Sequence, residues 1–275
     1  MRVHPSEIIA PAAKNGRGVG AFNVIQLELA EAIVAGAEKA NKPVILQLSE
    51  NMVKYHGGLA PIAKACIAIA ETSTVPVAVH LDHAESIDLV ADALELGIDS
   101  IMYDASKLPA EANQASTAAV TTLAHRTGAW VEAEIGEIGG KDGVHAPGVR
   151  TKPEDAAGFA KATGVDTLAV AVGSSHAMTD RSALLDFDLI ARIHAAVDVP
   201  LVLHGSSGVP DADLAKAVES GMTKINIATL LNKTFTESAR HTLGENPAMV
   251  DTRKYLGPAR DAVSDAVASL LGVIA

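Results

Sequence analysis

The stretch Val77-Ala78-Val79-His80-Leu81-Asp82-His83 says most about the fold of this 275-residue chain. It follows Pro76 directly, begins with small and β-branched apolar residues, and ends in two side chains that can carry chemistry. A short, nearly continuous apolar run of this kind predicts a strand buried on both faces, as in a parallel sheet. Asp82 and His83 would then lie at the carboxyl end of that strand.

Comparable runs recur along the chain, with amphipathic helical stretches between them. We expect strands near residues 18–23, 44–49, 77–82, 100–104, 130–135, 167–173, 201–204 and 224–227. Strands that alternate with helices imply right-handed βαβ units and a parallel sheet. Eight such units in about 250 residues favour closure as a (β/α)₈ barrel, the TIM barrel.

An open, doubly wound α/β sheet is the alternative, and it would carry a glycine-rich phosphate loop after its first strand. The segment Val24-Ile25-Gln26 offers no such loop. We therefore expect residues 1–275 to form a single (β/α)₈ barrel domain of the α/β class. A short N-terminal helix opened by Pro5 and a C-terminal helical extension would complete it.

Composition and charge exclude several classes of function. The net charge of −11 makes non-specific nucleic-acid binding unfavourable. No apolar run reaches the roughly 18 residues of a membrane span, and the N-terminus lacks the apolar core of a signal peptide. We expect a cytoplasmic protein without membrane or nucleic-acid partners. The lone cysteine, Cys66, lies in an apolar stretch and is expected to be a buried, inert thiol.

Three histidines follow three different expected strands. His83 follows the third strand, His176 the sixth and His204 the seventh, so all three would lie at the rim where barrel enzymes hold their active sites. Neutral imidazoles suit Zn²⁺, and three protein ligands with one open position are typical of catalytic zinc. Glu134, on the fifth strand, is a candidate fourth or alternate ligand. Asp82 adjoins a ligand, and its position fits either orientation of that ligand or proton transfer.

His80 has the same strand parity as Asp82 and should point into the barrel, where we expect a packed hydrogen-bond donor rather than a further ligand. The segment 139–148 follows the fifth strand and is rich in glycine, which suits a mobile lid over the site.

Small residues with accessible backbone N–H groups follow the late strands. The segments are 173–175, 205–208 and the run Asn226-Ile227-Ala228-Thr229, which ends the eighth strand and opens a helix. Barrel phosphate sites are commonly built from such late loops, and small side chains let the backbone approach an anion. We expect phosphate contacts from Gly173, Gly205, Ser206, Ser207, Ala228 and Thr229, although any one of these loops could be an ordinary turn.

With these motifs together, the chain resembles the class II, metal-dependent ketose-bisphosphate aldolases, which include fructose- and tagatose-bisphosphate aldolases. The resemblance extends from Gly20-Ala21-Phe22-Asn23 to Asp251-Thr252-Arg253-Lys254-Tyr255. It rests on the motifs HLDH (80–83), VEAEIG (131–136), AVAVGSSH (169–176), LHGSSG (203–208) and KINIAT (224–229).

The resemblance implies a (β/α)₈ fold in which His83, His176 and His204 hold Zn²⁺, with Co²⁺ or Fe²⁺ as other candidate metals. It implies that Asp82 is the acid/base acting on the substrate C4 hydroxyl, and that Glu134 takes a displaced or second metal position. The reaction would be reversible cleavage of fructose or tagatose 1,6-bisphosphate to dihydroxyacetone phosphate and glyceraldehyde 3-phosphate, a step of glycolysis and related carbohydrate metabolism.

The resemblance also implies the substrate contacts. Gly205, Ser207, Asn226 and Thr229 match the dihydroxyacetone-phosphate site, often with a monovalent cation (Na⁺ or K⁺) nearby, and Asn23 and Ser49 match positions near the substrate. Arg253 matches an arginine that binds the far phosphate in a neighbouring subunit's site. We therefore expect a homodimer or homotetramer.

Three positions depart from the family pattern. Ala177 stands where the family usually has glycine, Thr252 replaces the usual proline, and the lid carries Lys141-Asp142 where many members have a glutamate that moves the proton at C3. Asp142 is our candidate for that proton transfer. The ketose remains open: Ala228-Thr229 in place of Asp-Thr leans slightly toward the tagatose-like or broader ketose-bisphosphate branch, and a ketose 1-phosphate with a different tail is the alternative.

Three alternatives remain. A Schiff-base aldolase would need a buried lysine; Lys107 is the only serious candidate, because Lys224 begins the eighth strand and is expected at the opposite end of the barrel. A metallo-hydrolase barrel would commonly carry a His-x-His pair on its first strand, where this chain has Phe22-Asn23-Val24. A non-catalytic sugar-phosphate binder would not need the complete set of Asp82 and the histidine ligands.

Overall fold

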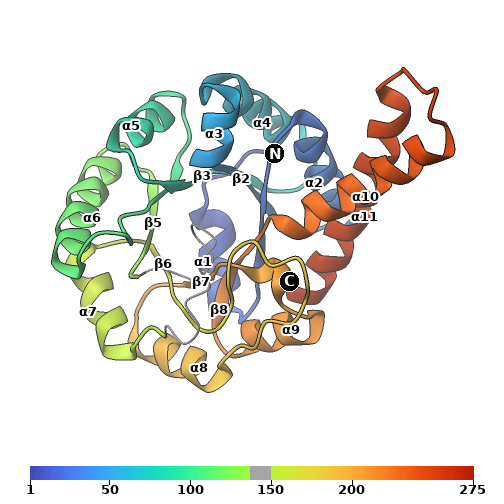
Figure 1. Cartoon of the computed structure of the whole chain (residues 1–275). Coiled ribbons are helices and arrows are strands. Elements are labelled where there is room, and N and C mark those ends of the chain that lie inside the picture. The colour runs from blue at the N-terminus through green and yellow to red at the C-terminus, as the bar shows by residue number, and fades with distance from the viewer. Residues whose placement is uncertain (137–149) are drawn as a thin grey trace.

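Eight parallel strands pair in sequence order, and the last pairs with the first to close a barrel, in a computed structural model that describes residues 1–136 and 150–275 (Figure 1). The strands are β1 (Val19–Asn23), β2 (Val44–Ser49), β3 (Val77–Ala84), β4 (Ser100–Tyr103), β5 (Trp130–Glu134), β6 (Thr167–Ala169), β7 (Leu201–Leu203) and β8 (Met222–Ile227). The expected fold class, a (β/α)₈ TIM barrel, is confirmed.

Helices surround the barrel as an outer ring, except the first, which lies at one end of the barrel (Figure 1). They are α1 (Ser6–Lys14), α2 (Leu27–Ala40), α3 (Glu50–His56), α4 (Ala60–Thr72), α5 (Ile87–Glu95), α6 (Ala110–His125), α7 (Pro153–Thr163), α8 (Phe187–Ala196), α9 (Asp211–Glu219), α10 (Thr229–Glu245) and α11 (Arg253–Ile274), with a short 3₁₀ turn, η2 (Ser206–Gly208). Side-chain caps begin several of them: Ser49, Ser86 and Asp186 accept hydrogen bonds from backbone N–H groups of α3, α5 and α8. Among the described helices, none has the length and apolar character to cross a bilayer.

The N-terminal helix α1 closes one end of the barrel, as expected, and Figure 1 shows it lying across the barrel axis. Its Ile8 and Ile9 are buried and pack with Val19, Ile45 and Ala78 from β1, β2 and β3. This end of the interior is therefore apolar, which leaves the carboxyl ends of the strands for polar side chains.

Strand β6 is shorter than the sequence predicts, because its expected continuation to residue 173 makes hydrogen bonds elsewhere. Thr151 and Ala171 share two hydrogen bonds. The Thr151 N–H donates to the Ala171 carbonyl, and the Ala171 N–H donates to the Thr151 hydroxyl oxygen. The carbonyl of Val172 accepts from Asp186. Residues past Ala169 thus pair with loop backbone rather than with β5 and β7.

Helix α4 carries the cysteine. Cys66 is fully buried there, and burial raises the pKa of its thiol to about 12. Because the thiolate is the reactive form, this environment agrees with the expected inert thiol.

The C-terminal extension consists of α10 and α11, which project from the barrel as a helical hairpin (Figure 1). Leu231 is the buried residue of α10, whereas α11 buries a full stripe that includes Val263, Val267 and Leu271. Helix α11 packs closely on α2 where Gly36 faces the carbonyl of Ser264: a Cβ atom added at Gly36 would lie 2.5 Å from that oxygen.

We expect Gly36→Ala to loosen this helix contact. The added methyl would overlap backbone that cannot move independently, so the free energy of unfolding should fall by about 1–3 kcal/mol. Gly272→Ala on α11 is the matched control, since nothing lies within 4 Å of its added Cβ, and it should be neutral or stabilising by up to about 1 kcal/mol. Urea unfolding followed by circular dichroism measures both. Equal stability of the two variants would contradict the close contact.

Candidate metal centre and active site

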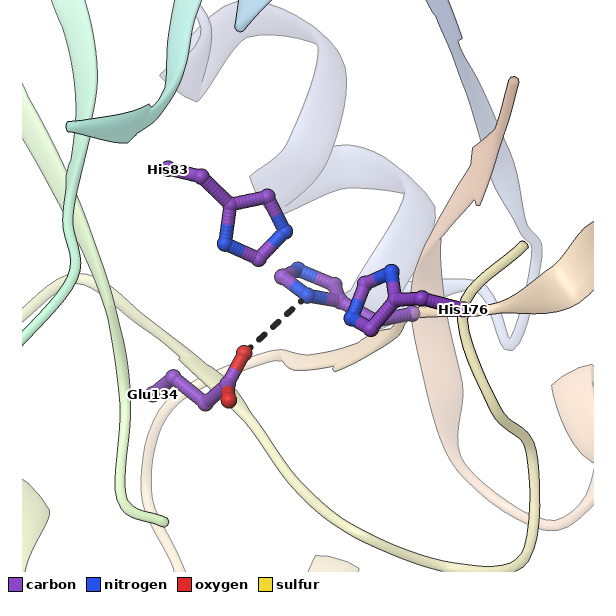
Figure 2. A group of neighbouring side chains, drawn as sticks. His83, Glu134 and His176 are labelled. Carbon is purple, nitrogen blue, oxygen red and sulfur yellow. Dashed lines mark ion pairs between the residues drawn. The ribbon is translucent and has the colours of Figure 1, made fainter. Parts of the chain in front are cut away.

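Four expected metal-ligand residues come together at the carboxyl ends of the strands (Figure 2). His83 lies in β3, Glu134 ends β5, His176 lies in the loop after β6, and His204 follows β7. One nitrogen or oxygen from each lies within 4.8 Å of the others. The three imidazole centroids are 4.7–5.5 Å apart. Residues separated by over a hundred positions thus form one compact donor cluster.

The backbone of His83 departs from regular strand geometry. Its φ is +50°, in the left-handed region, and the register between β3 and β4 shifts between Leu81 and Ala84. Successive residues of a regular strand point to opposite faces. The local irregularity instead lets two consecutive side chains, Asp82 and His83, both line one pocket.

Asp104 orients His83. The Nδ1 atom of His83 lies 2.6 Å from Asp104 Oδ2, and Asp104 Oδ1 accepts hydrogen bonds from the Ser106 N–H (3.1 Å) and hydroxyl (2.6 Å). A carboxylate at Nδ1 favours the tautomer with its proton there, which leaves the Nε2 lone pair for a metal. This role was not predicted from the sequence, although a carboxylate at the end of the fourth expected strand was a usable signal.

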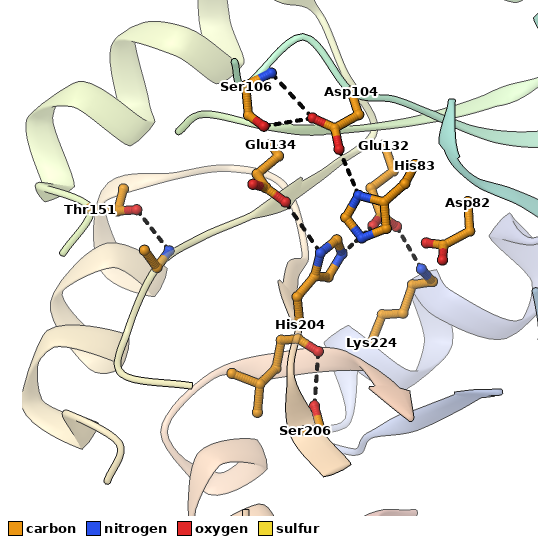
Figure 3. A network of polar contacts seen from close by, with 12 residues as sticks. Asp82, His83, Asp104, Ser106, Glu132, Glu134, Thr151, His204, Ser206 and Lys224 are labelled. Carbon is orange, nitrogen blue, oxygen red and sulfur yellow. Dashed lines mark hydrogen bonds and ion pairs between the residues drawn. The ribbon is translucent and has the colours of Figure 1, made fainter. Parts of the chain in front are cut away.

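Two glutamates contact His204 from opposite sides of its ring (Figure 3). His204 Nε2 lies 3.0 Å from Glu132 Oε1, and Nδ1 lies 3.3 Å from Glu134 Oε2. Burial alone would lower the pKa of His204, but the hydrogen bond to Glu132 and the negative charges of Glu132 and Glu134 outweigh burial and raise that pKa to about 9. Nδ1 makes no hydrogen bond to any described residue.

The end of β5 is held by α6. The side-chain amide of Asn113 donates to the carbonyls of Glu134 (3.1 Å) and Ile135 (3.4 Å), and its oxygen accepts from the Thr117 hydroxyl (3.0 Å). Asn113 is buried, so these bonds are shielded from solvent. They fix the backbone that carries Glu134, a contact that helix periodicity alone does not predict.

A charged layer lies inside the barrel next to these ligands (Figure 3). Lys224, which we expected at the opposite end of the barrel, is the third residue of β8, and its Nζ lies 2.8 Å from Glu132 Oε2. That expectation was wrong because β8 begins two residues earlier, at Met222. His80 points inward as predicted, with Nδ1 2.7 Å from the Ser100 hydroxyl. Burial would raise the pKa of Glu132, but Lys224 and His204 lower it on balance.

Asp82 is buried and held by one amide. Its Oδ2 accepts a hydrogen bond from the Asn23 side chain (2.9 Å), whose own oxygen accepts from Gln47 (3.1 Å). Burial alone would raise the pKa of Asp82, but the nearby His83, Lys224 and His204 charges outweigh it and lower the pKa to about 2. Asp82 is therefore a carboxylate at neutral pH.

A pocket of about 130 Å³ opens beside the cluster. Its lining includes the following predicted residues: Asn23, Ser49, Asp82, His83, His176, Gly205, Ser207, Asn226, Ala228 and Thr229. Ala177 also lines it, with a left-handed φ of +58°. The Ser207 hydroxyl accepts from the N–H groups of Ala228 and Leu230 (both 3.2 Å), which joins the loop after β7 to the first turn of α10.

Among the described residues, three predicted substrate-binding residues do not line this pocket. Gly173 packs against the Leu184 carbonyl, and the Ser206 hydroxyl turns back to the Leu203 carbonyl (2.9 Å). Arg253, at the start of α11, is 88% exposed and pairs with Asp251 (2.9 Å). Asp142 and the expected lid lie outside the described residues.

The donor set fits a divalent cation. Three imidazoles and one carboxylate are ligands that Zn²⁺, Co²⁺ and Fe²⁺ accept. Carboxylates bind one ring nitrogen of His83 and one of His204 on the side away from the cluster, which directs the remaining nitrogens inward. Around the cluster the buried carboxylates of Asp82, Asp104, Glu132 and Glu134 outnumber the buried ammonium of Lys224, so a cation would reduce an excess of negative charge.

Sequence comparisons place the chain among known proteins. The sequence model of the family described as "Fructose-bisphosphate aldolase class-II" matches residues 3–275. The fructose-bisphosphate aldolase of Thermus caldophilus is 41% identical, over 98% of this chain and 96% of that protein. The fructose-bisphosphate aldolase of Staphylococcus aureus strain Mu50 is 38% identical, over 96% of this chain and 94% of that protein.

Solved structures give the same result. The crystal structure of the YdjI aldolase from Escherichia coli K12 superimposes with a TM-score of 0.87 at 30% sequence identity, covering 100% of this chain and 97% of that one.

Proposed function

We propose that this chain, which belongs to the class II fructose-bisphosphate aldolase family, reversibly cleaves a ketose 1,6-bisphosphate to dihydroxyacetone phosphate and glyceraldehyde 3-phosphate. Membership makes the protein an aldolase, a carbon–carbon lyase whose class depends on a divalent metal. The observation that carries the proposal is the convergence of three imidazoles and Glu134 in one donor cluster, with the Asp82 carboxylate lining the same pocket as His83 and His176.

We assign the metal to His83, His176 and His204, with Glu134 as an additional or alternate ligand, and Zn²⁺ as the metal. When bound, Zn²⁺ would polarise the ketone carbonyl and stabilise the negative charge that develops as the carbon–carbon bond breaks. Asp104 and Glu132 keep the ring nitrogens of His83 and His204 aimed at the centre.

Asp82 is proposed to remove the proton of the C4 hydroxyl as the C3–C4 bond breaks. The Asn23 amide holds one carboxylate oxygen, while Oδ1 makes no hydrogen bond to a described residue and remains for the substrate. The low pKa of Asp82 keeps it ionised, as a general base must be. For protonation of C3 we retain Asp142 as the candidate from sequence.

The pocket wall opposite Asp82 is proposed to bind the phosphate next to the ketone. Gly205, Ser207, Asn226 and Thr229 supply small side chains, hydroxyls and an amide where α10 begins, and helix N-termini favour anions. This local positive potential reconciles an acidic chain with an anionic substrate. A monovalent cation nearby, Na⁺ or K⁺, stays a prediction.

The far phosphate is proposed to bind Arg253 of a second copy. Arg253 lies on the projecting hairpin with its side chain exposed, so it can act in trans. The working unit would then be a homodimer or homotetramer. The expected cytoplasmic location, without membrane or nucleic-acid partners, also stays a prediction.

The alternative Schiff-base route finds little support in the lysines. Lys107 is partly exposed and lies 3.2 Å from Glu85, and Lys224 is buried in its ion pair with Glu132. Neither has the surroundings of a neutral, nucleophilic amine. An aldolase for a different ketose 1-phosphate remains the second candidate, since Ala228 lines the pocket at a position where many fructose-type enzymes carry aspartate.

The reaction is tested with zinc-loaded protein on fructose 1,6-bisphosphate, tagatose 1,6-bisphosphate and fructose 1-phosphate. We expect triose-phosphate release from at least one bisphosphate, loss of activity with a chelator, and recovery with Zn²⁺. Borohydride plus substrate should leave the activity intact. Cleavage that persists without metal and is trapped by borohydride would assign the reaction to a lysine instead.

The role of Asp82 is tested with Asp82→Asn, which keeps the shape and the contact with Asn23 but removes the base. We expect kcat to fall by roughly 10²–10⁴-fold. Zn²⁺ affinity should stay close to that of the unaltered protein, because Asp82 is not one of the proposed ligands. Near-normal cleavage by the metal-loaded variant would remove Asp82 from the mechanism.

Action of Arg253 in trans is tested by mixing two inactive variants. Arg253→Ala and Asp82→Asn homo-oligomers should each be nearly inactive on a bisphosphate. After subunit exchange, one site of a mixed dimer has both residues intact, so activity should recover to about a quarter of the unaltered level when subunits pair at random. Lys254→Ala, a neighbouring exposed residue, is the control. No recovery in verified mixed dimers would mean that Arg253 acts within its own subunit or not at all.

A further inference from the structure

The barrel interior holds a buried ion pair that the proposed reaction does not use. Lys224 and Glu132 are each 1% exposed, and the ammonium lies 2.8 Å from Glu132 Oε2. We propose that this pair is a positioning device for His204: Lys224 orients the Glu132 carboxylate, and the carboxylate fixes the His204 ring for metal binding. This inference rests on the proposed metal site and adds residues to it.

The first step is the contact between Glu132 and His204. The carboxylate oxygen Oε1 lies 3.0 Å from His204 Nε2. A carboxylate only accepts hydrogen bonds, so it favours the tautomer with the proton on Nε2. The lone pair is then on Nδ1, the atom that faces Glu134 and makes no hydrogen bond to any described residue. Glu132 thereby selects which nitrogen is offered to a metal.

The second step is the contact between Lys224 and Glu132. The two carboxylate oxygens have different partners, His204 for Oε1 and Lys224 for Oε2. Among the described residues, the other charged or titratable group near this carboxylate is His80, whose Nε2 lies 3.9 Å from Oε2. Lys224 therefore supplies the main countercharge, and without it the buried carboxylate would lose both its anchor and its compensation.

A purely structural role explains the pair less well. Burying a pair of charges costs desolvation free energy that a pair at the surface does not. Apolar residues of similar volume in its place often stabilise a protein as much or more. The level below, around Ile45 and Ala78, is filled by apolar side chains. The charges occur at the level that contacts a ligand histidine, where orientation of a metal ligand is what they can add.

The test measures metal binding directly, by competition for Zn²⁺ with a chelating indicator and by visible absorption of the Co²⁺ form. We expect Lys224→Met to weaken Zn²⁺ binding at least 10-fold, within the range of about 10–100-fold seen when such supporting groups are removed, and to change the Co²⁺ spectrum. Ser100→Ala is the matched control: it removes a buried hydrogen bond to His80 on the same level without touching Glu132, and should leave affinity within about twofold.

A second variant keeps the test decisive if Lys224→Met does not fold. Glu132→Met/Lys224→Met removes both charges and fills the space with adaptable apolar side chains. We expect it to unfold at a temperature close to that of the unaltered protein, yet to bind Zn²⁺ at least 10-fold more weakly. Unchanged Zn²⁺ affinity and Co²⁺ spectrum in either folded variant would overturn the inference and leave the pair structural. Failure of the unaltered protein to bind Zn²⁺ would instead overturn the proposed function.

Discussion

Closure of the eight strands is the constraint on which the rest of this structure depends. A closed parallel barrel directs every second residue of each strand into a narrow interior, where side chains stack in levels. Near α1 the level is apolar, with Ile45 and Ala78. One level further along the strands are His80, Glu132 and Lys224, and the ligands lie beyond them. Buried polar side chains need partners, and here those partners come from other strands: Ser100 for His80, and Lys224 for Glu132.

This requirement makes the levels interdependent. Glu132 is compatible with burial because Lys224 and His204 contact its two oxygens. His204 in turn has glutamates on both sides of its ring. In a metal-free chain this cluster carries excess negative charge, which the high pKa of His204 reflects. A divalent cation and a proton are alternative ways to compensate the same carboxylates, so affinity for a metal is a consequence of how the interior is charged.

The elements were predictable because each depends on local pattern. Apolar, β-branched runs marked the strands to within a few residues, and strand ends marked His83, His176 and His204. What sequence did not predict depends on contacts across the barrel. The partner of Lys224 is on a strand nearly a hundred residues away, and β6 stops at Ala169 because loop backbone takes its hydrogen bonds. Periodicity specifies which face a residue occupies, and not which side chain it meets there.

The site also depends on backbone that the strand pattern does not allow. Three non-glycine residues of the described chain have positive φ: Asn41, His83 and Ala177. Asn41 ends α2 in the left-handed conformation common at helix C-termini. The other two are a proposed metal ligand and the direct neighbour of another. Such conformations cost on the order of 1–3 kcal/mol for residues other than glycine, and they persist where contacts with the surrounding structure hold them in place.

At His83 those contacts are the Asp104 hydrogen bond and the shifted register of β3 and β4. As a result, Asp82 and His83 share one pocket. A regular strand would have turned Asp82 and His83 to opposite faces, so the left-handed conformation at His83 brings the proposed base and the proposed metal ligand together.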